Sequence, residues 1–251
     1  MSIKYASVGA VARITLSRPE KRNAIDDRMM AELSEALAKA AADAATRVVV
    51  LDAEGPDFCA GMDLQMMAET VNAGAEEFSK QAERLASLYQ SLRDHPKPVI
   101  AAVKGRALGG GSGLAMACDV VLAAESAKFG FPEVNIGFVP AIVTVFLRRS
   151  VGEKQAFDLL TSGEPIDARR ACELGMITRV FLDAEFEASV EAYVAKLAAK
   201  STSAVGMTKE LLYTIDGLSF EAALQAGAEM NALARATEDA KRGFERFAKR
   251  K

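Results

Sequence analysis

Hydrophobic and polar residues follow different periods in different parts of the chain. Residues 3–7 and 11–16 alternate one by one about Gly9, which predicts a β-hairpin. Residues 47–52 and 98–103 are almost entirely apolar, as in strands covered on both faces. Apolar residues recur every three or four positions after Asp26, a predicted helix N-cap, and again from Phe78 to Leu92. Strands thus alternate with amphipathic helices, which predicts an α/β core.

From residue 183 onward the pattern is helical throughout, in four segments at about 183–199, 202–215, 219–235 and 237–248. We therefore divide the chain into an α/β core, residues 1–182, and a C-terminal helical region, residues 183–251. This region carries many apolar residues for its length. Two explanations are open: the helices fold back on the core, or they form a subunit interface.

A glycine cluster joins the strand at 98–103 to a helix of small residues that leads to another strand at 119–124. Gly109, Gly110 and Gly111 are consecutive, and Gly113 follows two residues later. Glycines at such a junction allow close approach of a ligand, and the first N–H groups of the helix have no partners within the helix. The cluster predicts a site for an anion or an oxyanion. The alternative is close packing of helix on strand without a ligand.

Charge and cysteine content narrow the classes of function. The chain carries 31 basic and 34 acidic residues, so its overall charge does not favour nucleic acid or an anionic membrane as a partner. Three widely spaced cysteines without a CxxC motif argue against a disulfide framework and a zinc site. We expect a cytoplasmic protein, because neither a signal peptide nor a membrane-spanning run is found.

The chain has one histidine, His95, in a turn with two prolines, where we expect it on the surface. Catalysis by Ser-His-Asp or Cys-His groups needs a histidine beside the nucleophile. Chemistry in this protein is therefore expected to depend on carboxylates and backbone dipoles.

Four segments in order along the chain resemble motifs of the crotonase family, the enoyl-CoA hydratases and isomerases. They are RPEKRNA at 18–24, FCAGMDL at 58–64, VKG at 103–105 with the glycines at 109–111, and FGFPE at 129–133 with Gly137 and Pro140. The resemblance implies a spiral of ββα units with a C-terminal helical trimerisation region, in a homotrimer or hexamer. The stretch IGFVPAI at 136–142 further resembles the methylglutaconyl-CoA hydratase-like branch.

The resemblance also implies a site for an acyl-CoA thioester, with no metal and no cofactor apart from the coenzyme A of the substrate. The N–H groups of Met62 and Gly110 would bind the thioester oxygen. Coenzyme A would contact the residues Lys21, Arg22, Ala24, Ala60, Asp63 and Leu64, with Arg22 as the best phosphate ligand. The acyl group would contact Met66, Phe131, Phe138 and Ile142.

Glu133 is the candidate catalytic acid and base. It stands among apolar residues, so burial is expected to raise its pKa towards the working range. The alternative is a first-turn glutamate that stabilises a helix N-terminus. Hydratases of the family usually carry a second glutamate where this chain has Gly113. We therefore predict hydration of a 2-enoyl-CoA through one glutamate; the alternatives are isomerisation by the same residue and non-catalytic binding of acyl-CoA.

Overall fold

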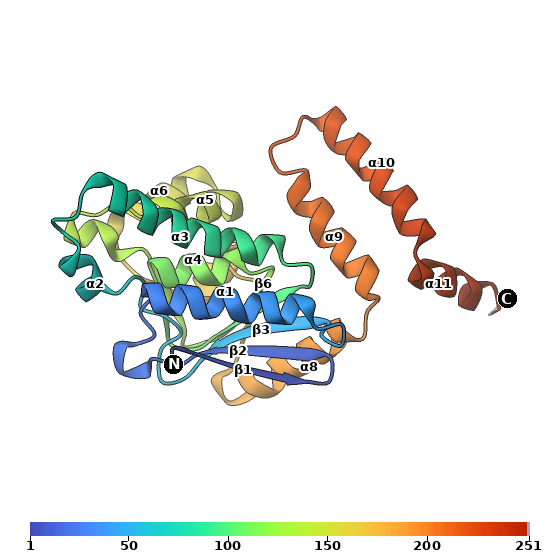
Figure 1. The fold of residues 1–251 in the computed structure, drawn as a ribbon, viewed down its shortest axis with the longest axis horizontal. Helices are drawn as coiled ribbons and strands as arrows, with labels where there is room; N and C mark the ends of the chain where they lie inside the picture. Colours follow the sequence, from blue (N-terminus) through green and yellow to red (C-terminus); the bar gives the residue numbers. More distant parts are fainter. Residues whose placement is uncertain (250–251) are drawn as a thin grey trace.

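The computed structural model describes residues 1–249, and a six-stranded sheet lies at its centre (Figure 1). The strand order is β1 (Ile3–Val8), β2 (Val11–Leu16), β3 (Val48–Ala53), β4 (Val99–Val103), β6 (Val120–Ala124) and β9 (Arg179–Phe181). The first two strands form the predicted antiparallel hairpin, with Gly9 at a φ of +59° in its turn. All other pairs are parallel, with Val50 opposite Ile100 and Ala101 opposite Val121.

Helices cover both faces of the sheet, as the apolar strands predicted. On one face, α1 (Asp27–Ala42), α3 (Ala75–Asp94) and α4 (Gly110–Ala117) pack against alternate residues such as Leu51 and Ala101 (Figure 1). On the other face, α8 (Phe186–Ala198) packs against Val50 and Ile100. Because neighbouring residues of a strand point to opposite faces, each strand contributes to both layers.

Shorter elements complete the core. The remaining α-helices of this part are α2 (Leu64–Glu69), α5 (Ala141–Ser150), α6 (Glu153–Ser162) and α7 (Ala168–Glu173). Three 3₁₀ helices are η1 (Pro19–Lys21), η2 (Pro132–Ile136) and η3 (Asp183–Glu185). Asp26 caps α1 by accepting from the N–H of Met29 at 2.7 Å, and Asp167 caps α7 in the same way, both as predicted.

A second sheet, not foreseen from the sequence pattern, sets the position of the glycine cluster. It contains β5 (Arg106–Leu108), β7 (Lys128–Gly130) and β8 (Ile166–Asp167) in that order. Pairing of β5 with β7 brings the N–H of Gly109 within 2.8 Å of the carbonyl oxygen of Gly130. The glycine cluster and the segment that carries Glu133 therefore lie side by side.

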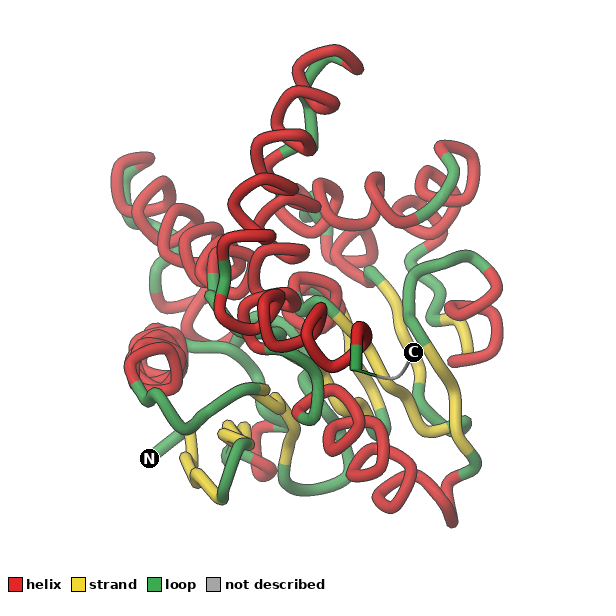
Figure 2. Tube along the Cα trace, turned by 90° about the vertical axis from the view of Figure 1, so that its right-hand side faces the viewer, coloured by secondary structure: helices red, strands yellow, loops and turns green. Residues whose placement is uncertain are grey.

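Of the C-terminal helices, α8 covers one face of the sheet, and the three described helices that follow it do not fold back over the sheet. α9 (Thr202–Thr214), α10 (Phe220–Ala236) and α11 (Glu238–Ala248) project from one end of the core, and they lie in front of it in Figure 2. α9 is anchored to the core, because Lys209 Nζ and the Tyr213 hydroxyl both bind the Asp119 carboxylate, at 2.8 and 2.7 Å. α10 has no buried residue, and Phe220 and Leu233 are 74% and 62% exposed.

His95 corrects the expectation of a surface position. It caps the C-terminus of α3 and is only 4% exposed. Its ring nitrogens lie 3.0 Å from the carbonyl oxygen of Lys97 and 3.2 Å from that of Leu37. Burial lowers its pKa, so the ring is neutral at physiological pH and serves to join α3 to α1. Within residues 1–249, no helix is long and apolar enough to cross a membrane.

Candidate active site

A cavity of about 420 Å³ opens between α2 and α3 on one side and the loop from η2 into α5 on the other. Among residues 1–249, Thr70, Gln81 and Glu133 contribute its only polar side chains, and no lysine, arginine or histidine of that range lines it. The complete lining is Met62, Met67, Thr70, Val71, Phe78, Gln81, Ala82, Leu85, Gly110, Glu133, Phe138, Val139, Pro140, Ala141, Ile142 and Val143. The cavity therefore suits an apolar group that ends near a single carboxylate.

The backbone N–H groups of Met62 and Gly110, both in the cavity lining, have no acceptor within residues 1–249. Gly110 is the first residue of α4, so its N–H has no helical partner. The bridge between Ile25 and Met62 uses the carbonyl of Gly61 and the N–H of Asp63, which leaves the N–H of Met62 unused. The two predicted oxyanion donors thus lie in the wall of one cavity.

Glycines are required for this approach of the two segments. Gly61 has a φ of +99°, and a Cβ atom on it would lie 2.9 Å from the carbonyl oxygen of Leu108 and 3.4 Å from the nitrogen of Gly110. Gly109 has a φ of +51°, and its Cβ atom would lie 2.6 Å from Glu133 Oε1. A side chain at either position would separate the two donors or displace the carboxylate.

Glu133 lies on η2 with its carboxylate against Gly109. Its Oε2 atom is buried and has no hydrogen-bond partner within residues 1–249. Burial raises the pKa of this carboxyl, an effect only partly offset by its own backbone N–H. A carboxylate with an unsatisfied oxygen in an apolar cavity is suited to proton transfer.

Apolar and aromatic atoms fill the space beside Gly113, where a second glutamate is usual in hydratases. A Cβ atom on Gly113 would lie 2.5 Å from Val143 Cγ1 and 3.0 Å from Tyr89 Cε2. Within the described part of the chain, Glu133 is the only carboxylate that lines the cavity. Gly113, which stands where the usual glutamate is expected, is therefore matched by the close packing of Val143 and Tyr89 around it.

Two of the four predicted acyl contacts line the cavity and two do not. Phe131 is fully buried in the core, and Met67 lines the cavity whereas Met66 does not. Phe138 and Ile142 do line it. The sequence analysis missed Phe78 and Leu85, because their spacing on α3 indicated a single core-facing stripe. Both residues line the cavity, but Leu85 is otherwise buried in the core, whereas Phe78 is 44% exposed.

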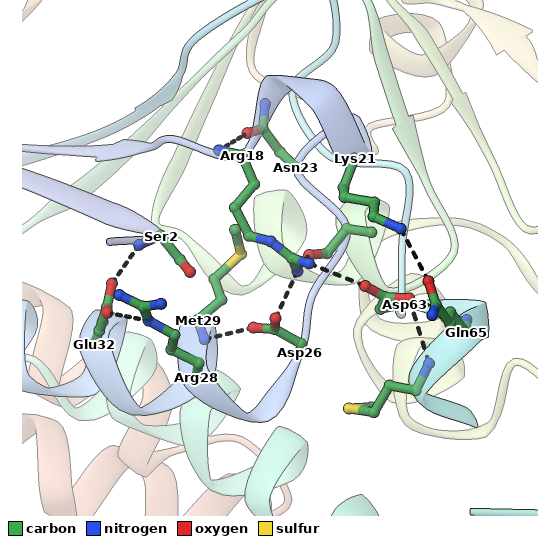
Figure 3. Close-up of polar contacts among 12 residues, drawn as sticks. Ser2, Arg18, Lys21, Asn23, Asp26, Arg28, Met29, Glu32, Asp63 and Gln65 are labelled. Carbon is green, nitrogen blue, oxygen red and sulfur yellow. Dashed lines mark hydrogen bonds and ion pairs between the residues drawn. The ribbon is translucent and has the colours of Figure 1, made fainter. Parts of the chain in front are cut away.

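Two of the predicted coenzyme A contacts, Lys21 and Asp63, lie near each other where η1 meets the start of α2 (Figure 3). Lys21 and Arg22 are exposed, and Lys21 Nζ donates to Gln65 Oε1 at 3.0 Å. The N–H of Ala60 donates to the carbonyl oxygen of Arg22 at 3.0 Å, which joins the two segments. Among the remaining three residues, Ala24 is buried and Leu64 is 58% exposed.

Asp63 is occupied by structural contacts. Its carboxylate caps α2 by accepting from the N–H groups of Gln65 and Met66, and it pairs with Arg18 at 3.1 Å (Figure 3). Arg18 also pairs with Asp26 at 2.8 Å, so it joins the caps of α1 and α2. The sequence analysis missed this role of Arg18, although the residue stands in the first motif. No group of three metal-binding side chains occurs in residues 1–249.

Comparison with known proteins shows the family of the chain. A family model described as enoyl-CoA hydratase/isomerase matches residues 7–251, so the chain belongs to this family, and it is an enoyl-CoA hydratase/isomerase-type enzyme. It is 39% identical to the putative enoyl-CoA hydratase of Thermus thermophilus over 239 residues, which are 95% of this chain and 94% of that protein. It is 36% identical to the 2,3-dehydroadipyl-CoA hydratase of Escherichia coli, over 94% of this chain and 91% of that protein.

Solved structures show the same fold. The crystal structure of an enoyl-CoA hydratase from Mycobacterium smegmatis superimposes with a TM-score of 0.96 at 32% identity, covering 100% of this chain and 97% of that one. The predicted crotonase fold with C-terminal helices is confirmed.

Proposed function

We propose that this enzyme hydrates the 2,3-double bond of an enoyl-CoA thioester, with Glu133 as its one catalytic carboxylate. The observation that carries the proposal is the buried, unsatisfied oxygen of Glu133 in the same cavity as the unused N–H groups of Met62 and Gly110. The names of the relatives from Thermus thermophilus and Escherichia coli support hydration rather than isomerisation.

In this mechanism the thioester oxygen accepts hydrogen bonds from Met62 and Gly110. Glu133 takes a proton from water while the water oxygen bonds to C3, and the π electrons move towards the thioester oxygen to give an enolate. The same carboxylic acid then gives its proton to C2, so that one water molecule is added and Glu133 returns to its charged form. Each N–H donor is expected to stabilise the enolate-like transition state by about 3 kcal/mol.

Isomerisation is the second candidate, favoured by the packing beside Gly113. Val143 and Tyr89 leave no second carboxylate there to hold the attacking water. A single base suffices for isomerisation: Glu133 would take a proton from C2 of a 3-enoyl-CoA and return it to C4 as the double bond moves into conjugation.

The acyl group is proposed to be uncharged along its whole length. A carboxylate within the cavity would lie among apolar side chains without a cation to pair with it, at a cost of several kcal/mol. This argues against methylglutaconyl-CoA, whose acyl group carries a free carboxylate. Lys21 and Arg22 are proposed to bind the phosphates of coenzyme A, since both are exposed beside the start of α2.

The exposed apolar residues of α10 support a homotrimer or hexamer as the active assembly. Size-exclusion chromatography with light scattering tests this proposal, and a monomer at micromolar concentration would contradict it.

The reaction is tested with crotonyl-CoA and 3-hexenoyl-CoA, followed by the absorbance of the conjugated thioester. Loss of absorbance from crotonyl-CoA indicates hydration, and a gain from 3-hexenoyl-CoA indicates isomerisation. Glu133→Gln should abolish either activity, whereas the exposed Glu164→Gln should retain it. Equal rates for Glu133→Gln and wild type would exclude the proposed chemistry. Tight binding of acyl-CoA with no turnover and no deuterium exchange at C2 would instead indicate a non-catalytic acyl-CoA-binding protein.

A further inference from the structure

Tyr89 is the residue on α3 that reaches the glycine cluster. Its side chain is fully buried and does not line the acyl cavity. Its hydroxyl donates to the carbonyl oxygen of Gly110 at 2.5 Å, and its ring contacts the ring of Phe146 edge to face at 5.5 Å. The phenol is therefore held from both ends, against the residue that provides one oxyanion donor.

The first turn of α4 needs such support from outside. Its sequence begins Gly110-Gly111-Ser112-Gly113, and glycines in a helix add backbone freedom and supply no side chain to pack. Other contacts also hold the turn: Ser112 Oγ donates to the carbonyl oxygen of Ala107 at 2.6 Å and accepts from the N–H of Gly130 at 3.3 Å, and Gly111 lies against the backbone of Cys59. None of these contacts is made by Gly110 itself.

Gly113 and Tyr89 fit each other. A Cβ atom on Gly113 would lie 3.1 Å from the Tyr89 hydroxyl oxygen, closer than ordinary contact, and 2.5 Å from Val143. The glycine that replaces the usual second acid thus makes room for the phenol. Burial raises the pKa of Tyr89 well above its ordinary value, so the hydroxyl keeps its proton and remains a donor at any pH at which the enzyme works.

We propose that Tyr89 is a positioning residue of the oxyanion hole: its hydroxyl fixes the first turn of α4 so that the Gly110 N–H keeps its direction towards the thioester oxygen. It does not touch substrate and exchanges no proton. The inference rests on the proposed function, because it assigns Tyr89 a role in polarising the thioester.

Tyr89→Phe tests the inference, since it removes the hydroxyl and keeps the ring. Loss of one complete oxyanion donor costs 10²- to 10³-fold in kcat, so a misdirected donor is expected to cost about 10- to 100-fold, with KM changed less than about threefold. A second readout is spectroscopic. Polarisation of a conjugated thioester shifts its absorbance to longer wavelength, so bound 2,4-hexadienoyl-CoA should show a smaller shift in Tyr89→Phe than in wild type.

Tyr213→Phe is the matched control. It also removes a tyrosine hydroxyl with a single acceptor, Asp119 at 2.7 Å, but outside the cavity. It should lower stability and leave kcat and the absorbance shift unchanged. If Tyr89→Phe does not fold, Gly113→Ala displaces the phenol from the other side and should give the same loss of shift.

The outcomes are distinct. A full absorbance shift and kcat within twofold of wild type in Tyr89→Phe would overturn the positioning role and leave the proposed function standing. Absence of both turnover and shift in the wild type would overturn the two together.

Discussion

A negative charge at the far end of the acyl chain should be strongly disfavoured by this enzyme. The cavity wall is formed by aliphatic and aromatic side chains, and its two neutral polar side chains, Thr70 and Gln81, carry no charge to pair with a carboxylate. Each methylene buried in the cavity should contribute about 0.8 kcal/mol, or about fourfold in kcat/KM, until the wall is filled. An unpaired buried carboxylate costs several kcal/mol.

The magnitude follows from these two terms. Replacing the terminal methyl of 2-octenoyl-CoA by a carboxylate removes one favourable contact and adds an unpaired charge. We expect kcat/KM to fall at least 100-fold, which corresponds to about 2.7 kcal/mol. The assay is loss of conjugated-thioester absorbance for the two substrates at equal concentration, with isothermal titration of octanoyl-CoA and suberoyl-CoA as a comparison that needs no turnover.

Gln81→Lys provides a gain-of-function arm. Gln81 lies on α3 in the cavity wall, and a lysine there would supply the missing counter-ion. The ratio of kcat/KM for the carboxylated over the apolar substrate should rise at least tenfold. Gln90→Lys is the control, because Gln90 is on the same helix but exposed and bound to Asp94 at 2.7 Å. Equal use of both acyl groups by the wild type would refute the reasoning about the cavity wall.

Three further predictions concern titratable groups. Because burial raises the pKa of Glu133 above 4.5, kcat/KM should fall as pH drops through that raised value. Burial penalises the charged form of the carboxyl, so Glu133→Gln should melt at a higher temperature than wild type at pH 8 but not at pH 4. A melting temperature independent of pH in both proteins would contradict this. Lys209→Met should lower the free energy of unfolding in urea by about 3 kcal/mol, because it leaves the mostly buried Asp119 carboxylate without its cation. A loss below 1 kcal/mol would show that contacts other than this ion pair anchor α9 to the core. Titration of the native protein with a disulfide reagent should modify Cys172 alone. Burial raises the pKa of the Cys59 thiol to about 12, and Cys118 is also buried. Rapid reaction of two or more thiols would contradict this prediction.

The sequence pattern predicted the main sheet and the helices on it, because long apolar and amphipathic segments have clear periods. The division at residue 183 did not anticipate that α8 packs on the sheet, because an amphipathic pattern does not say which surface its apolar face covers. It could not predict the small second sheet, since strands of two or three residues carry no period. That sheet nevertheless decides which segments meet at Gly109.

The residues of the candidate site were predictable only in part from the sequence. Glu133, Met62 and Gly110 were selected by motif and lie in one cavity, as the resemblance implied. Phe131 and Met66 were assigned by nearness in sequence to these motifs, but side-chain direction depends on the 3₁₀ turn of η2 and the short helix α2. His95 was placed on the surface because prolines flank it, whereas its ring is buried: Nε2 donates to the carbonyl oxygen of Leu37, and Nδ1 accepts from the N–H of Lys97.

One helix, α3, both lines the cavity and contacts the glycine cluster. Leu85 lines the cavity, and Tyr89, one turn further along the same helix, binds Gly110. A substitution that moves α3 to admit a larger acyl group would also move the phenol of Tyr89. Substrate range and kcat are therefore expected to change together. Redesign of chain-length preference should therefore start at Phe138, which lies in the loop on the opposite wall and leaves this helix in place.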